Sequence, residues 1–304
     1  MYFRPAWLLI IVAGLFLSTQ ALAGEGGYVG PKKCEECHPD VVKAFALNVH
    51  SHAGNWVSTY QSCETCHGPG EAHAQSGDPS LIKNPLKMKA ADVNAICLGC
   101  HEKGKLALWK GSTHESRGLA CIDCHQMHGN RRKLLKADVE LDVCKRCHGD
   151  IKAEIWKSSH HPIREGKMTC TSCHNPHGTI APKLIDANTI NEKCYECHAE
   201  KRGPYLWEHK PAVEDCTNCH TPHGSNHEKL LVNKVPWLCQ SCHSGSRHPG
   251  TPYALHGAGP GGSPAATIGN VYQNVGIQGI YRACLNCHPN IHGSNSPSGQ
   301  FFTR

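Results

Sequence analysis

The sequence predicts a fold of short helices and coil with little strand, assembled from an internal repeat instead of around an aliphatic core. Of the 304 residues, Leu, Ile, Val and Phe together make up only 56, too little apolar area to offset the entropy of ordering the chain. Segments such as 39–50, 102–114 and 150–160 can form short helices, and Gly, Pro, Asn and Ser fill the joints between them. No sustained alternation of apolar and polar residues, which is typical of strands, appears in 24–264. Some group other than aliphatic side chains must therefore form the core.

Residues 1–23 are typical of a secretory signal peptide. Arg4 precedes an apolar run from Ala6 to Leu17, and an Ala-Leu-Ala sequence that ends at Ala23 offers a cleavage site. The run is too short to span a bilayer comfortably, which disfavours the alternative of an uncleaved membrane anchor. The net charge of +6 is mild, and no Lys/Arg block interleaved with aromatic residues supports nucleic-acid binding. We therefore expect an exported protein with a mature chain of residues 24–304.

All 20 cysteines lie in C-x-x-C pairs, and His follows every pair immediately. This is the attachment motif of c-type haem, in which the two thiols bond to the porphyrin and the His becomes the proximal iron ligand. Neither a disulfide scaffold nor a series of zinc sites requires a His after the second Cys in all ten motifs. The sequence therefore predicts ten covalently attached haem c groups, which would supply the missing core. The thiol pairs are Cys34/Cys37, Cys63/Cys66, Cys97/Cys100, Cys121/Cys124, Cys144/Cys147, Cys170/Cys173, Cys194/Cys197, Cys216/Cys219, Cys239/Cys242 and Cys284/Cys287, and the proximal ligands are His38, His67, His101, His125, His148, His174, His198, His220, His243 and His288.

Fourteen further histidines are available as distal ligands, and ten haems need ten of them. Met cannot fill this role, because only three Met remain after the signal peptide, and two His ligands keep a haem at lower potential than His and Met. His160 is preferred only weakly over His161, since its offset matches that of His50 whereas the spacing from Trp156 favours His161. We expect the unused His52, His227 and His248 to be surface residues. The predicted distal ligands are His50, His73, His114, His128, His160, His177, His209, His223, His256 and His292.

The motifs and distal histidines repeat as five tandem two-haem modules. After the first motif of each pair a His follows at 11–13 residues, and after the second motif a His follows closely. The sequences His-Gly and Lys-Leu-Leu or Lys-Leu-Ile recur after the second motif of three modules. A tandem repeat of this kind predicts a quasi-linear array. The modules are residues 34–73 (module 1), 97–128 (module 2), 144–177 (module 3), 194–223 (module 4) and 239–292 (module 5).

The short distal spacing excludes some ligand pairs. Two His on opposite sides of one iron have Cα atoms roughly 12–13 Å apart, from two side-chain lengths and two metal–nitrogen bonds. Three residues of chain reach at most ~10–11 Å. His128 therefore cannot share an iron with His125, and the same holds for His177 with His174 and for His223 with His220. Each must bind another haem, which draws neighbouring haems together.

Three segments resemble the MtrA/DmsE family of periplasmic decahaem cytochromes, which includes the PioA and MtoA proteins. They are C-E-T-C-H-G-P-G-E-A-H at 63–73, S-H-H-P-I-R-E-G at 159–166, and C-L-N-C-H with H-G-S-N-S-P-S-G at 284–299. The resemblance covers essentially all of residues 30–304. It implies an elongated haem wire in the periplasm that inserts into an outer-membrane β-barrel porin. It also implies exchange of electrons between periplasmic or inner-membrane carriers and an extracellular multihaem cytochrome, a metal or a terminal reductase.

We therefore expect an electron-transfer conduit and not an enzyme. All ten motifs end in His and spare His are plentiful, so no open axial site for a substrate is indicated. A multihaem reductase is the less favoured alternative. A freely diffusing periplasmic electron shuttle stays open, because the barrel partner rests on the resemblance. The direction of electron flow is not encoded in these motifs.

Overall fold

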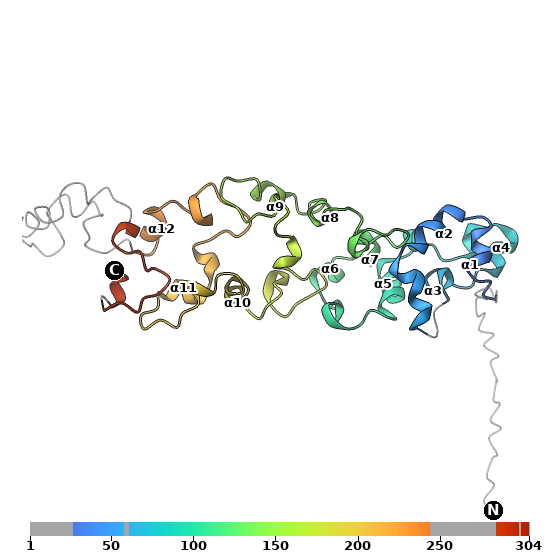
Figure 1. Cartoon of the computed structure of the whole chain (residues 1–304), viewed down its shortest axis with the longest axis horizontal. Helices are drawn as coiled ribbons and strands as arrows, with labels where there is room; N and C mark the ends of the chain where they lie inside the picture. Colours follow the sequence, from blue (N-terminus) through green and yellow to red (C-terminus); the bar gives the residue numbers. More distant parts are fainter. Residues whose placement is uncertain (1–26, 58–60, 244–283, 298, 304) are drawn as a thin grey trace, which may run out of the picture. The chain divides into compact units, whose positions relative to one another are not determined.

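The structure, a computed structural model, describes residues 27–57, 61–243, 284–297 and 299–303. In these ranges the backbone forms short helices, turns and coil, and its β-type pairings are isolated bridges (Figure 1). The predicted fold of short helices and coil with little strand is confirmed there. No helix within these ranges is both long and apolar enough to cross a membrane. The predicted signal peptide, His248 and the predicted ligand His256 lie outside the described residues.

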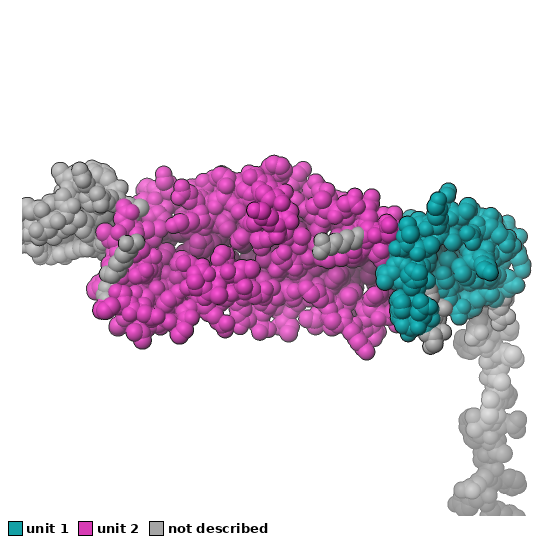
Figure 2. Space-filling view, viewed as in Figure 1, with its two compact units in different colours: residues 1–88 teal, residues 89–304 magenta. Residues whose placement is uncertain are grey.

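The chain divides into two compact units, unit 1 over residues 1–88 and unit 2 over residues 89–304 (Figure 2). Module 1 belongs to unit 1, and modules 2 to 5 belong to unit 2. The described helices of unit 1 are α1 (Pro31–Glu35), α2 (Pro39–Ala46), η1 (Val49–Asn55), α3 (Cys63–His67), α4 (Glu71–Ser76), η2 (Pro79–Leu81) and η3 (Pro85–Lys87), where η marks a 3₁₀ helix. Those of unit 2 are α5 (Ala90–Leu98), η4 (Gly104–Leu106), α6 (Thr113–Ser116), α7 (Cys121–Cys124), η5 (Arg132–Leu134), α8 (Glu140–Cys144), α9 (Gly149–Glu154), η6 (Cys170–Ser172), η7 (Pro182–Leu184), α10 (Ile190–Tyr195), η8 (Ala199–Lys201), α11 (Lys210–Glu214), η9 (Cys216–Asn218), η10 (Glu228–Leu230), α12 (Trp237–Gln240), η11 (Cys284–Asn286) and η12 (Gly299–Phe301).

The helices are shorter than the sequence pattern suggests. The helix expected over 102–114 is absent: the segment forms η4 and the start of α6, with coil between them. Gly104 and Gly111 have φ values of +63° and +84°, a left-handed conformation that no α-helix contains. The helix expected over 150–160 stops at Glu154 in α9.

Each C-x-x-C-H motif forms about one helical turn. In nine motifs the backbone N–H of the His donates to the carbonyl of the first Cys at 2.9–3.1 Å, and in the tenth the motif is α3 itself. A turn closed in this way places the two thiols and the His on one side of the chain, because residues three and four positions apart share a helix face. The motif thus folds locally so that its two thiols and its His can bind one group together.

The described protein atoms do not form a hydrophobic core of their own. The buried hydrophobic residues in the described ranges number seven: Ala53, Val93, Trp109, Ala120, Val143, Ile155 and Ala181. Other large apolar side chains are exposed to solvent, among them Ile180 at 89% and Leu206 at 78% exposure. This is the outcome that the low aliphatic content predicts.

Within unit 2, backbone contacts tie consecutive modules together. Ser159 and Ser225 exchange hydrogen bonds of 2.9 and 2.8 Å, and Trp207 and Ser294 exchange bonds of 3.0 and 2.8 Å. The glycine that follows a distal His permits the close approach. A Cβ on Gly224 would lie 2.0 Å from the Glu154 carbonyl oxygen, and no side chain fits there. Gly178 lies equally close to the Leu108 carbonyl oxygen, so packing accounts for the glycine after His177 and His223, but not for Gly129 after His128.

Candidate haem-binding sites

The first cysteines of the two motifs in each module lie in contact. Burial and the neighbouring Cys63 thiol raise the pKa of Cys34 to about 11. Corresponding thiol–thiol hydrogen bonds raise the pKa of Cys97, Cys144 and Cys194 above the ordinary range. Two haems attached in one module would therefore start from adjacent sulfur atoms. The contacting pairs are Cys34–Cys63, Cys97–Cys121, Cys144–Cys170, Cys194–Cys216 and Cys239–Cys284.

The second cysteines connect one module to the next within unit 2. Burial raises the pKa of Cys124, Cys173 and Cys219, and in each case a thiol of the following module adds to the increase. The interacting thiols are Cys124–Cys147, Cys173–Cys197 and Cys219–Cys242. Along unit 2, first cysteines in contact within a module therefore alternate with second cysteines that lie near one another across a module boundary. Consecutive attachment motifs from Cys97 to Cys287 are neighbours in space, in chain order.

Two further attachment thiols of the predicted set, Cys66 and Cys100, are the second cysteines of their motifs. Cys66 is half-buried in α3 of unit 1, whereas Cys100 is exposed after the end of α5 in unit 2. Attachment of haem to Cys66 and Cys100 rests on their place in the C-x-x-C-H motif and stays a prediction.

Seven of the proximal histidines face a second histidine across a gap of uniform width. The ring centroids are 6.0–6.3 Å apart, too far for direct ring contact. Two metal–nitrogen bonds of about 2 Å and two ring radii of about 1.1 Å sum to a centroid separation of about 6 Å, so the gap has the size of one metal ion. The pairs are His38–His73, His148–His114, His125–His177, His198–His161, His174–His223, His243–His209 and His220–His292.

The six pairs of unit 2 all join neighbouring modules, and they do so reciprocally. At the junction of modules 2 and 3, His125 faces His177 while His148 faces His114. The same exchange occurs between modules 3 and 4 and between modules 4 and 5. In unit 1, His38 faces His73 of its own module. Three residues of chain are too short to let two His share one iron. In agreement, none of the seven pairs joins a proximal His to the His three residues after it. The seven pairs do not include His50, His67, His101, His128 or His288.

The structure corrects the choice between His160 and His161. His161 faces His198, with the ring centroids 6.3 Å apart. His160 instead uses both ring nitrogens within the protein: Nδ1 donates to the Lys157 carbonyl at 2.8 Å, and Nε2 lies 3.0 Å from Glu165. His160 therefore has no nitrogen left for a metal. Of the unused histidines, His52 is exposed, as expected, whereas His227 is half-buried.

Backbone carbonyls orient the proximal His of the second motif in modules 2, 3 and 4. The Nδ1–H of His125 donates to the Lys133 carbonyl at 2.9 Å. His174 donates likewise to Lys183 at 2.9 Å, and His220 to Lys229 at 2.7 Å. A hydrogen bond on Nδ1 fixes the tautomer and directs Nε2 toward the opposing His. The Lys-Leu repeat is visible in the sequence, but the role of its backbone carbonyl toward the His is not.

The same three Lys-Leu pairs have an uncommon backbone conformation. Lys133 and Leu134 have φ values of +54° and +52°, and the other two pairs lie between +56° and +58°. A left-handed conformation costs a residue with a side chain about 1–2 kcal/mol. The turn is held by a return hydrogen bond, in module 2 from the Gln126 N–H to the Leu134 carbonyl at 2.6 Å. Near the C-terminus, the Phe301 carbonyl accepts from His288 Nδ1, and Phe302 has φ +54°.

Other histidines are oriented by neutral oxygen atoms. The Nδ1–H of His114 donates to the Pro176 carbonyl at 2.8 Å, and that of His161 to Pro222 at 2.7 Å. His177 Nδ1 lies 3.2 Å from the amide oxygen of Asn175. In unit 1, the acceptors for His67 and His73 are the Lys83 and Asp78 carbonyls, and that for His50 is the Asn48 amide oxygen.

Burial keeps the distal rings in the neutral form that a metal requires. Burial, with the nearby His125 second, lowers the pKa of His177 to about 4. Burial also lowers the pKa of His209, His223 and His292. A neutral imidazole keeps a lone pair for coordination.

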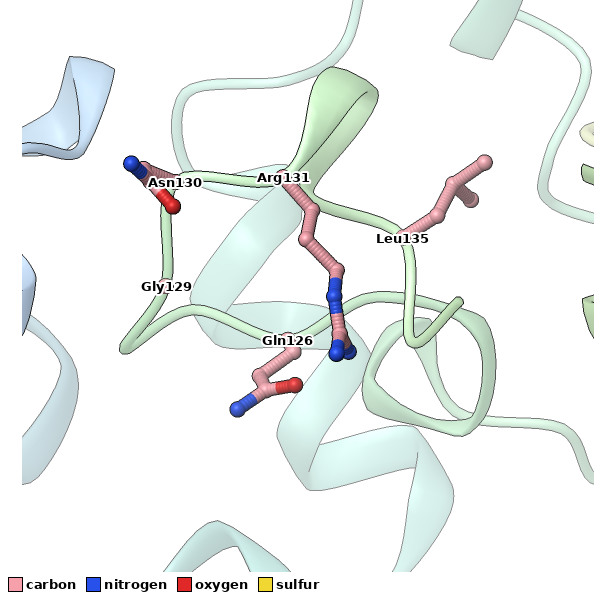
Figure 3. A pocket seen from close by; sticks show the side chains of 5 residues that line it. All are labelled: Gln126, Gly129, Asn130, Arg131 and Leu135. Carbon is pink, nitrogen blue, oxygen red and sulfur yellow. The ribbon is translucent and has the colours of Figure 1, made fainter. Parts of the chain in front are cut away.

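A pocket of about 260 Å³ lies beside the Lys133 turn. Figure 3 shows its lining: Gln126, Gly129, Asn130, Arg131 and Leu135. Arg131 donates to the Lys136 carbonyl at 2.9 Å and pairs with Asp138 at 3.0 Å. The guanidinium therefore braces the loop that presents the Lys133 carbonyl.

The residues fit a haem better than a zinc ion or a disulfide. Each motif offers two thiols and a His, and seven motifs have a second His across a metal-sized gap. No group of three or more metal-ligating side chains converges within the part of the chain that the structure describes. Trp109 is 6% exposed, and its indole N–H lacks a hydrogen-bond partner among the described residues. A buried donor of this kind needs an acceptor that the protein does not supply.

Comparison with known proteins gives the same assignment. The chain is 40% identical over 288 residues to the multiheme cytochrome MtrA of Shewanella baltica (strain OS185), and the match covers 92% of this chain and 84% of the relative. A family model described as a doubled CXXCH motif matches residues 160–203 and 209–248, and a model of cytochrome c-type protein NrfB-like matches 63–141. An undecaheme cytochrome from the S-layer of Carboxydothermus ferrireducens is 20% identical, and the match covers 80% of this chain and 32% of that one. Its TM-score of 0.14 is too low to carry an argument about the fold.

Proposed function

Because the chain belongs to the MtrA family of multihaem c-type cytochromes, we propose that it is an electron-transfer conduit with ten haem c groups. The conduit relays electrons across or toward the outer membrane, either out to an extracellular metal or terminal reductase, or inward from Fe(II). Bound haem iron supplies the one-electron chemistry. The residues of this chain attach, orient and shield that iron.

The observation that carries the proposal is the chain of neighbouring cysteines along unit 2. First cysteines in contact within modules, and second cysteines near one another across module boundaries, form a series from Cys97 to Cys284. Electron transfer needs such a series of closely spaced carriers. Opposing His pairs close both faces of the site between them, so they exclude a substrate. This supports an electron carrier that is not an enzyme.

We assign the iron ligands accordingly. All ten motif histidines are proximal ligands. The distal ligands are the ten predicted from the sequence, with His161 in place of His160. Residues 1–23 are the signal peptide, and residues 24–304 form the decahaem domain of five modules.

The family membership supports a location in the periplasm, associated with the outer membrane. The partners are a β-barrel porin, an extracellular multihaem cytochrome or terminal reductase, and periplasmic or inner-membrane carriers. Nucleic acid is not a partner.

Transmembrane electron flow tests the proposal. Vesicles that carry the chain with its porin are loaded with reduced methyl viologen, and external ferric citrate is added. We expect rapid oxidation of the internal dye. The matched control replaces Cys170 and Cys173 by Ser, which removes one haem from the middle of the series and should slow the reaction at least several-fold. Equal rates with and without that haem would contradict the conduit. Recovery of the chain only in the soluble periplasmic fraction would favour the diffusing shuttle.

A further inference from the structure

One distal histidine of unit 2 has an acidic neighbour on its outer nitrogen. His223, which faces His174, has its Nδ1 3.4 Å from Oε2 of Glu154 in α9. The Glu154 side chain is 33% exposed and that of His223 is 30% exposed, so the contact is half-buried. The equivalent nitrogen of His177 meets the neutral amide oxygen of Asn175. The two sites therefore differ by a full charge beside the ligand.

A substitution within the repeat accounts for the difference. Asn175 precedes His177 by two positions, and its Oδ1 accepts from both the backbone N–H and the ring of that His at 3.2 Å. Thr221 occupies the same position before His223, and its hydroxyl is committed to the Gly224 and Leu230 carbonyls at 3.1 and 3.3 Å. Thr221 is thus a donor that faces away from His223. The group beside this nitrogen of His223 comes instead from the neighbouring module, because Oε2 of Glu154 lies 3.4 Å away.

The backbone fixes Glu154 in this position. Gly224 lies directly against the Glu154 carbonyl, and the Ser159–Ser225 hydrogen bonds join the same two segments. Ile155, the next residue, is completely buried. Lys157 pairs with the other carboxylate oxygen at 3.8 Å, in an i,i+3 contact that is about one-third exposed. These contacts hold the Glu154 backbone at the junction of modules 3 and 4, within reach of His223.

We propose that Glu154 is a positioning residue that lowers the reduction potential of the haem attached at Cys170 and Cys173. A carboxylate this close to the Nδ1–H makes the imidazole a more basic ligand, which would stabilise ferric over ferrous iron. Reduction adds one electron to this haem, and the proton stays on Nδ1. The series of haems in unit 2 thereby acquires a low-potential step at module 3. The inference rests on the proposed haem ligation by His174 and His223.

The test is a spectroelectrochemical titration of the full chain with Glu154→Gln. Gln has the same shape without the charge. We expect one haem, seen as a one-electron component with one tenth of the α-band change, to become easier to reduce. Its equilibrium constant for reduction should rise about tenfold, which corresponds to a potential about 59 mV higher for one electron. Glu154→Asp, which keeps the charge at shorter reach, should shift the same component by less.

Glu200→Gln is the matched control. Its carboxylate lies 3.9 Å from Nδ1 of His198, is 62% exposed, and so should act only through weak, screened attraction. Titrations of the Glu154→Gln variant that superimpose on wild type, or shift no more than this control, would overturn the inference. Low-spin ferric spectra and the haem mass of the wild-type chain test the ligation separately, so its failure is distinguishable. If Glu154→Gln lost the haem altogether, an unshifted Glu154→Asp titration would still reject the proposal.

Discussion

The ring of His125 faces the ring of His177 in the next module, with centroids 6.1 Å apart and planes inclined by 17°. His128, three residues from His125, does not take this place. The reverse exchange, His148 with His114, closes the same junction from the other side. Each module of unit 2 therefore completes the binding sites of its neighbour, and the modules are interlocked parts of one assembly.

Replacement of a distal His should damage the haem of the neighbouring module. For His177→Ala we expect one tenth of the ferric haem to become high-spin, because the iron attached at Cys121 and Cys124 loses its second ligand. The haem attached at Cys170 and Cys173, in the same module as His177, should be unaffected. Visible and EPR spectra of the purified protein measure the high-spin fraction. His52→Ala, at an exposed site outside the pairs, is the control. A wholly low-spin His177→Ala protein would contradict the pairing.

Adjacent histidines should behave in opposite ways. We expect His161→Ala to produce one high-spin haem, because His161 faces His198. His160→Ala should leave all haems low-spin, since both nitrogens of His160 bond to Lys157 and Glu165. The same ferric spectra measure both variants. The reverse pattern would restore the sequence-based choice of His160.

The sequence predicted the features that depend on local spacing. The ten motifs, the five modules and the exclusion of His128 as partner of His125 all follow from residue counts and chain reach. The preference for His160 was wrong because spacing along the chain does not distinguish two adjacent histidines. The Glu165 carboxylate lies 3.0 Å from Nε2 of His160, and only the folded structure shows this contact. The role of Glu154 depends on its contact with a residue of the next module, which no local pattern contains.

The left-handed Lys-Leu turns should tolerate Gly and reject β-branched residues. Lys183 is exposed and has φ +58°, so a substitution there tests the backbone with little change in packing. Lys183→Gly removes the steric cost but adds unfolded-state entropy, and we expect a change within about 1 kcal/mol. Lys183→Val should cost about 1–3 kcal/mol and weaken the hold on His174. Thermal unfolding of the two variants, with the potential of one haem as a second readout, measures both effects. Equal stability of the two would mean that the turn conformation is not required.

Loss of one haem should destabilise two modules where its two His ligands come from different modules. It should destabilise only one module where both ligands come from that module. With Cys170 and Cys173 replaced by Ser, the gap between His174 and His223 loses its iron, and with it the link between modules 3 and 4. With Cys34 and Cys37 replaced by Ser, the affected pair, His38 and His73, lies wholly within module 1. Both proteins should contain nine haems by intact mass. Limited proteolysis should then cut several-fold faster in both modules 3 and 4 for the first variant, and in unit 1 alone for the second. Because a bound group stabilises only the segments that contact it, cleavage confined to module 3 in the first variant would show that His223 does not bind that iron.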